Sequence, residues 1–110
     1  MTVPFLLIVN ILYSNIMKHR SRLEIIALIL EIANETNNGH DKATQQKIMY
    51  KAYLSYSHLK SYLSLMMENN LLEYFSDSRI YKTTDKGIYF LKIYRDLTEV
   101  VAMTNNIIIR

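Results

Sequence analysis

Apolar residues recur at helical spacing over residues 21–35, "SRLEIIALILEIANE". Ser21 can cap the first turn, and Glu24, three residues on, completes a capping box. Apolar residues also occupy the opposite side of this helix, so we expect it to be buried nearly all round, by the rest of the domain or by a second subunit. The turn-forming residues of "TNNGHD" then end the helix.

Two shorter helical patterns follow, with about three residues between them. Thr44 can cap "QQKIMYKA", which directs Ile48, Met49 and Ala52 inward. After the tight connection "YLS", Ser55 can cap "YSHLKSYLSLMMEN". The apolar stripe of that second helix consists of Leu59, Tyr62, Leu63, Met66 and Met67. Two short helices joined so closely have the sequence outline of a helix-turn-helix.

Two short β-prone runs come next, "LLEYF" and "RIYKTT", separated by "SDS". They predict a β-hairpin with one face on the helices, at the position of the wing in a winged helix. We expect Leu72, Tyr74 and Ile80 on one face, with Phe75 and Tyr81 on the other.

The last helical pattern is "DKGIYFLKIYRDLTEVVAM", which Thr84 can cap. Apolar residues recur along it at intervals of four, three and four, a coiled-coil-like seam formed by Phe90, Tyr94, Leu97 and Val101. The chain then ends in "TNNIIIR", whose isoleucines a monomer would expose. We therefore expect residues 85–110 to form a C-terminal dimerisation helix.

Ser21 to Leu97 resemble the small archaeal winged-helix transcriptional regulators of the Arn-regulator type, and the related archaeal chromatin proteins. The resemblance is carried by "RSRLEIIALILE", "KIMYKAYLSYSHLKSYLSLMMENNLLEY" and "YKTTDKGIYFL", in this order and at compatible spacing. It implies a mainly α fold with a small β-hairpin (α+β), in which residues 18–84 form a winged helix-turn-helix domain. It also implies double-stranded DNA as the partner.

Residues 1–17 lie outside this resemblance and form an apolar N-terminal extension. We weigh three interpretations, in decreasing order of preference: a start assigned upstream of a natural one at Met17, an element packing on the domain or on a second subunit, and a membrane anchor. The apolar run is shorter than the roughly 18 to 20 residues of a spanning helix. Its basic cluster follows it, whereas a secretory signal has positive charge in front.

Composition narrows the function classes. The 110 residues include no cysteine, and the three histidines lack ligand spacing, so we expect no metal site and no cofactor. Phosphate-binding and hydrolase motifs are absent from the sequence, and we assign no catalytic residue and no enzymatic activity. The net charge of +3 is compatible with a polyanionic partner.

The helix from Tyr56 is the candidate recognition helix. No Asp or Glu occurs from Ala43 to Met67, as suits a surface close to phosphates. Short polar side chains project away from the apolar stripe, and lysines and one arginine can reach phosphates or, for Arg79, an adjacent minor groove. The candidate DNA-binding residues are Tyr56, Ser57, His58, Lys60, Ser61, Ser64, Lys47, Lys51, Arg79 and Lys82, with Lys42 a further phosphate partner.

Tyr50 and Tyr62 fit core or subunit-interface positions better than DNA contacts, because aromatic rings gain most from burial. We expect a cytoplasmic, homodimeric, sequence-specific regulator that places the helix from Tyr56 in the major groove. The alternatives are an architectural chromatin protein with little sequence specificity, a protein-interaction module and a membrane-tethered regulator that uses Phe5 to Ile16.

Overall fold

The computed structural model describes residues 22–35 and 42–109. Residues 22–35 are helical, and the remaining elements are α2 (Gln45–Ala52), α3 (Tyr56–Glu68), β1 (Leu72–Phe75), β2 (Ile80–Thr83) and α4 (Asp85–Ile109). The predicted mainly helical fold with one hairpin is therefore confirmed. Residues 1–17 and the expected cap Ser21 lie outside the described residues.

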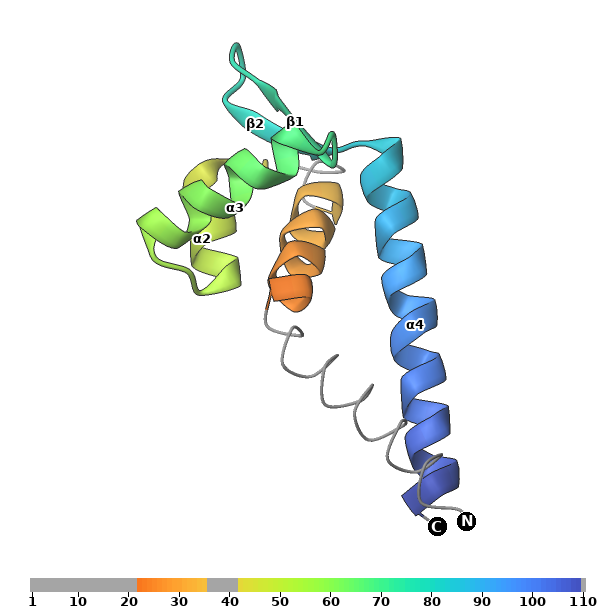
Figure 1. The fold of residues 1–110 in the computed structure, drawn as a ribbon. Helices are drawn as coiled ribbons and strands as arrows, with labels where there is room; N and C mark the ends of the chain where they lie inside the picture. The colour runs from red at the N-terminus through yellow and green to blue at the C-terminus, as the bar shows by residue number, and fades with distance from the viewer. Residues whose placement is uncertain (1–21, 36–41, 110) are drawn as a thin grey trace.

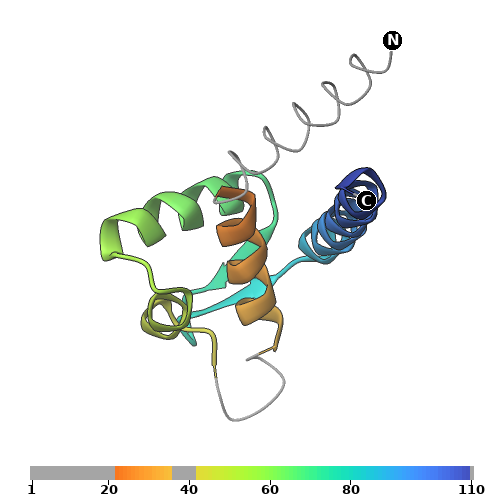
Figure 2. The same cartoon turned by 90° about the horizontal axis from the view of Figure 1, so that it is seen from below.

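The helix of residues 22–35 forms the centre of the molecule. Figures 1 and 2 show α2 and α3 on one side of it and α4 on the other, while the hairpin lies at one end. Ile29 and Leu30 are fully buried, and the remaining apolar residues of this helix are buried or half-buried, as expected. From the other elements the core receives Ile48, Leu59, Leu63, Met66, Leu72, Tyr81 and Leu91.

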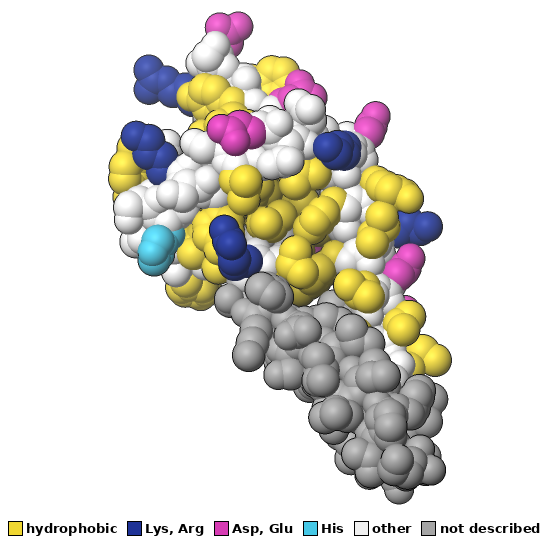
Figure 3. All heavy atoms as spheres, viewed as in Figure 1, with side chains coloured by type: hydrophobic (Ala, Val, Ile, Leu, Met, Phe, Trp, Pro, Cys, Tyr) yellow, Lys and Arg dark blue, Asp and Glu magenta, His cyan; other side chains and the backbone are white. Residues whose placement is uncertain are grey.

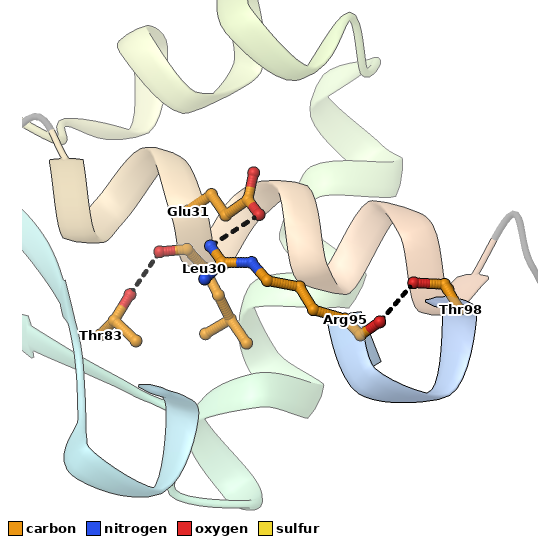
Figure 4. Close-up of polar contacts among 5 residues, drawn as sticks. All are labelled: Leu30, Glu31, Thr83, Arg95 and Thr98. Carbon is orange, nitrogen blue, oxygen red and sulfur yellow. Dashed lines mark hydrogen bonds and ion pairs between the residues drawn. The ribbon is translucent and has the colours of Figure 1, made fainter. Parts of the chain in front are cut away.

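Side-chain contacts tie the hairpin and α4 to the central helix (Figure 4). The Thr83 hydroxyl at the end of β2 donates a hydrogen bond of 2.6 Å to the carbonyl oxygen of Leu30. Further along α4, Arg95 Nη2 lies 3.1 Å from Glu31 Oε1 in an exposed ion pair. The half-buried Thr83 contact and the buried Leu91 fix the beginning of α4, and the ion pair adds little because water screens it.

The start of α4 is capped as predicted. Thr84 Oγ1 accepts a hydrogen bond from the Gly87 N–H at 3.0 Å and donates one to the carbonyl oxygen of Asn70 at 2.6 Å. Gly87 is buried, and a Cβ atom there would lie 2.5 Å from the carbonyl oxygen of Leu71. Glycine therefore allows α4 to approach the backbone just before β1 closely.

The hairpin faces differ from the expected ones. The observed register pairs Leu72 with Thr83 and Tyr74 with Tyr81, so these four residues share a face. Ile80 instead pairs with Phe75 on the other face. The expectation was wrong because alternation fixes faces within each strand, while the four-residue turn of residues 76–79 sets the phase between the strands.

Two further expectations need correction. Tyr50 is 78% exposed, so the expected core position is wrong, because the inward side of α2 is occupied by Ile48 and Ala52; a position at a subunit interface stays a prediction. Tyr62 is half-buried against the core, as expected. The helix α4 also continues through the predicted tail to Ile109, since no glycine or proline follows Gly87 to end it.

Candidate nucleic-acid interface

Both helices of the helix-turn-helix begin at the predicted caps. Thr44 Oγ1 accepts a hydrogen bond from the Lys47 N–H at 3.2 Å, and Ser55 Oγ accepts one from the His58 N–H at 3.3 Å. Each cap satisfies a backbone donor that the first helical turn leaves free. Buried side chains of α3, chiefly Leu59, then fix which side of that helix faces outward.

The outward side of α3 carries the predicted polar surface. Tyr56, Ser57, Lys60, Ser61 and Ser64 are all exposed, and together with Leu65 and Glu68 they line one shallow open groove. The structure therefore brings five of the predicted residues together. His58 is also exposed on α3 but does not line the groove.

Contacts within this surface order its side chains. The Ser61 hydroxyl donates to the carbonyl oxygen of Ser57 at 3.2 Å, which leaves the oxygen lone pairs available as acceptors. Lys60 Nζ lies 6.0 Å from the centre of the Tyr56 ring, at the outer limit of a cation–π contact. The ammonium group thus stays over the first turn of α3, where base edges would be approached.

Sequence reasoning did not include two members of the groove, Leu65 and Glu68. Glu68 is the first carboxylate after the acid-free stretch and lies at the last turn of α3. A phosphate near that end would be repelled, so the surface suited to a polyanion is the N-terminal part of α3. The position of Glu68 in the sequence was the signal that could have set this limit.

Three further cations lie on or just before α2, the first helix of the pair. Lys51 is exposed in the last turn and Lys47 is half-buried in the first. Lys42 is exposed just before the helix. Their exposure and half-exposure are compatible with the predicted contacts to the DNA backbone.

The wing, which consists of β1, the turn of residues 76–79 and β2, carries the two predicted cations Arg79 and Lys82. Arg79 is exposed and adopts φ 56° at the end of the turn. Lys82 Nζ lies 5.2 Å above the Phe75 ring, and its residue pairs across the hairpin with Glu73. The turn also holds the exposed Asp77, so the wing carries two acids against two bases. Sequence reasoning overlooked this balance.

A tyrosine pair supports the base of the wing. The rings of Tyr74 and Tyr81 have centroids 4.7 Å apart, at an interplanar angle of 44°. Burial raises the pKa of Tyr81 above the usual 10.0, and the nearby hydroxyls of Tyr74 and Tyr56 add to the rise. Tyr81 therefore remains neutral at physiological pH and acts as a packing residue of the hairpin.

The predicted seam on α4 is divided between the core and the solvent. Phe90 and Tyr94 pack partly against the core, Val101 is half-buried and Leu97 is 42% exposed. A neighbouring stripe is more exposed, formed by Tyr89, Ile93, Leu97, Val100 and Met103. Hydrophobic side chains gather over the central helix and along α4 in Figure 3. The exposed stripe was missed because the heptad pattern alone does not show which side of α4 the domain covers.

Other types of site find no support in the described parts of the chain. Among residues 22–35 and 42–109 there is no group of three or more His, Cys, Asp or Glu side chains placed to hold a metal ion. Within the same residues, no helix is both long enough and apolar enough to cross a membrane.

Comparison with known proteins agrees with this geometry. A family model described as winged helix-turn-helix matches residues 19–102, which contain every described element up to the last turns of α4. A search of curated proteins finds no significant match. The match spans the capped helix pair, the hairpin and most of α4, and it covers more than half of the chain, so the chain belongs to this family.

Proposed function

Because the chain belongs to the winged helix-turn-helix family, we propose that it is a transcriptional regulator that binds specific double-stranded DNA as a homodimer. The N-terminal half of α3 would enter the major groove. The wing would lie on the sugar–phosphate backbone, with Arg79 reaching toward a minor groove. The observation that carries this proposal is the exposed α3 groove, which contains Lys60 and three serines within a stretch free of acids from Ala43 to Met67.

The chemistry of this surface supports base reading by short side chains. Serine hydroxyls donate and accept hydrogen bonds at base edges, and lysine can contact guanine or a phosphate. A groove lined at this end by Ser57, Lys60 and Ser61 lets bases approach the helix closely. The resemblance to archaeal regulators supports transcription control as the role.

A second candidate is an architectural chromatin protein with little sequence preference. One observation favours it: the α3 groove contains no Arg, Asn or Gln, the side chains that make the strongest two-point contacts with bases. Selection of duplexes from a random pool separates the two candidates. A regulator should enrich one motif and bind it at least about a thousandfold tighter than random DNA at the same salt concentration.

Matched charge variants test the interface itself. Lys60→Gln and Lys92→Gln remove the same charge, but Lys92 lies on α4, across the central helix from α3 (Figure 2). If Lys60 contacts a phosphate, its replacement makes the negative slope of log affinity against log salt shallower by about 0.9 per subunit, or about 1.8 for a bound dimer, while Lys92→Gln leaves the slope unchanged. Equal effects of the two variants would show that only net charge matters and would refute the assignment of this face.

The homodimer is supported by the apolar side chains of α4. Leu97 belongs both to the predicted seam and to the exposed stripe, so Leu97→Asp should dissociate a dimer formed through either. Val100 and Val101 then distinguish the two, since Val100 is 57% exposed and Val101 is half-buried. Analytical ultracentrifugation of Val100→Asp and Val101→Asp identifies the face used, and a wild-type protein that sediments as a monomer at micromolar concentration would exclude the dimer.

A further inference from the structure

The turn between α2 and α3 exposes an unusual amount of aromatic surface. Tyr50 is 78% exposed, Tyr53 is 92% exposed and Tyr56 is 58% exposed. Tyrosine rings normally gain stability by burial of the ring while the hydroxyl stays wet. Of these three, only Tyr56 lines the α3 groove, so the duplex-binding surface does not account for Tyr50 and Tyr53.

Tyr53 occupies a backbone position that suits another residue type. Its φ and ψ are 54° and 44°, the left-handed region. Its N–H bonds to the carbonyl oxygen of Tyr50 at 3.4 Å, and the next N–H, of Leu54, bonds to that of Met49 at 3.2 Å. This pair of bonds defines a Schellman motif, in which the left-handed residue is usually glycine because a Cβ atom is disfavoured there.

The end of α3 provides an internal comparison. Asn70 has φ 60°, and the N–H groups of Asn70 and Leu71 bond to the carbonyl oxygens of Met67 and Met66 in the same pattern. Asparagine is among the few residues that tolerate this conformation. At the equivalent position after α2 the chain carries a bulky ring that contributes almost nothing to the core. A residue kept in a costly conformation, with its side chain in solvent, points to a function for that side chain.

The charges around the three rings indicate what they would bind. Lys51, which follows Tyr50 in the sequence, and Lys60, whose Nζ lies 6.0 Å from the centre of the Tyr56 ring, are both exposed. The stretch from Ala43 to Met67 contains no carboxylate. Aromatic rings interleaved with cations, without acids, characterise surfaces on which unpaired bases stack while lysines hold the backbone. An intact duplex offers such rings little, since its bases are already stacked on one another. The hydrogen-bonded turn also keeps the Cα atoms of Tyr50 and Tyr53 within about 7 Å of each other.

We propose that this tyrosine surface, formed by Tyr50, Tyr53 and Tyr56 with Lys51 and Lys60, binds single-stranded DNA by stacking unpaired bases on the rings. This activity goes beyond duplex binding through the α3 groove. It would let the protein hold a melted or terminal segment of DNA. Tyr56 and Lys60 belong to both surfaces, whereas Tyr50 and Tyr53 belong to the tyrosine surface alone.

The test measures fluorescence anisotropy of a labelled thymidine 12-mer and of a 12-base-pair duplex, with the full chain at one fixed salt concentration. Wild type should bind the 12-mer. Tyr53→Gly should weaken that binding by about fivefold or more, as expected for one lost stacking contact, and change duplex binding less than twofold. Because glycine fits the left-handed conformation, the variant should unfold at the same or a higher temperature, so lost binding cannot be ascribed to unfolding.

Two more variants complete the experiment. Tyr53→Phe keeps the ring and should bind the 12-mer as tightly as wild type does. If Tyr53→Phe instead loses as much affinity as Tyr53→Gly, the tyrosine hydroxyl rather than ring stacking makes the contact, and the proposal is overturned. Ile88→Ala shortens an apolar side chain that is 45% exposed on α4, outside both the predicted seam and the exposed stripe, and should change nothing. An equal loss with Ile88→Ala, or no binding of the 12-mer by wild type, would also overturn the proposal.

A uridine 12-mer measured in parallel shows whether RNA binds the same surface, since the bases of both oligonucleotides can stack on the rings. Tighter binding of the uridine 12-mer than of the thymidine 12-mer would overturn DNA as the ligand.

Failure of this proposal is distinct from failure of the proposed regulator. If the protein binds duplex as proposed but does not bind single strands, only the role of Tyr50 and Tyr53 is refuted. If Lys60→Gln leaves the duplex affinity unchanged, the role of the α3 groove is refuted.

Discussion

Replacement of Gly87 by alanine tests how closely α4 packs against the hairpin. The added Cβ would lie 2.5 Å from the carbonyl oxygen of Leu71 and 2.6 Å from Thr83 Cγ2, whereas ordinary contacts begin near 3.4 Å. A backbone carbonyl cannot rotate away, so α4 or the strand must shift. Overpacking of this kind costs about 1 to 3 kcal/mol, and the better helix propensity of alanine offsets up to about 1 kcal/mol. We therefore expect a net loss of about 1 to 2 kcal/mol in the free energy of unfolding.

Thermal unfolding followed by circular dichroism, at one protein concentration, measures this loss. For a domain of this size about 1 kcal/mol corresponds to roughly 4 to 8 °C, so the midpoint for Gly87→Ala should fall by about 5 to 15 °C. Lys92→Ala, at an exposed position of the same helix, is the matched control and should stay within about 0.5 kcal/mol of wild type. An unchanged or raised midpoint for Gly87→Ala would mean that helix propensity prevails and would refute the close approach.

Three other substitutions have defined outcomes. Thr84→Ala removes the cap of α4 and the hydrogen bond to Asn70, and should lower the free energy of unfolding measured by urea denaturation by about 1 to 2 kcal/mol. A near-zero change would mean that water replaces the hydroxyl in both hydrogen bonds. Because the pKa of Tyr81 is raised in the folded state, its contribution to stability is complete below pH 10 and is lost as pH rises through the folded pKa. Tyr81→Phe should therefore reduce the loss of stability at alkaline pH. A dependence of stability on pH identical to that of wild type would contradict this prediction. Arg95→Ala should change stability by less than about 1 kcal/mol, since its ion pair with Glu31 is exposed, and a larger loss would mean that the pair is more than a surface contact.

Local sequence rules predicted the elements that dominate the fold. Thr44, Ser55 and Thr84 cap the helices they were expected to cap, because a hydroxyl before an apolar-periodic run has one strongly favoured role. The outward direction of Tyr56 and Lys60 followed from the buried stripe of α3, since residues off that stripe must point away from the core. The exposed α3 groove was predictable for the same reason.

The remaining features depend on contacts between elements that are distant in sequence. The hairpin faces depend on cross-strand register, which alternation within each strand cannot supply. Tyr50 was expected to pack because it is aromatic, yet the side of α2 that packs was already filled by Ile48 and Ala52. The left-handed Tyr53 escaped notice because it lacks the glycine that usually marks such a turn.

The distribution of charge divides the two parts of the proposed interface. The wing contains Glu73 and Asp77 as well as Arg79 and Lys82, so it carries no net charge and attracts a polyanion weakly. The stretch from Ala43 to Met67 holds lysines and no acids, and electrostatic attraction should arise mainly there. We therefore expect the salt dependence of DNA binding to report on α2 and α3, with the wing affecting orientation more than attraction. The three lysines of that stretch, Lys47, Lys51 and Lys60, carry a charge of +3, which equals the net charge of the whole chain, so the charges of the remaining residues cancel.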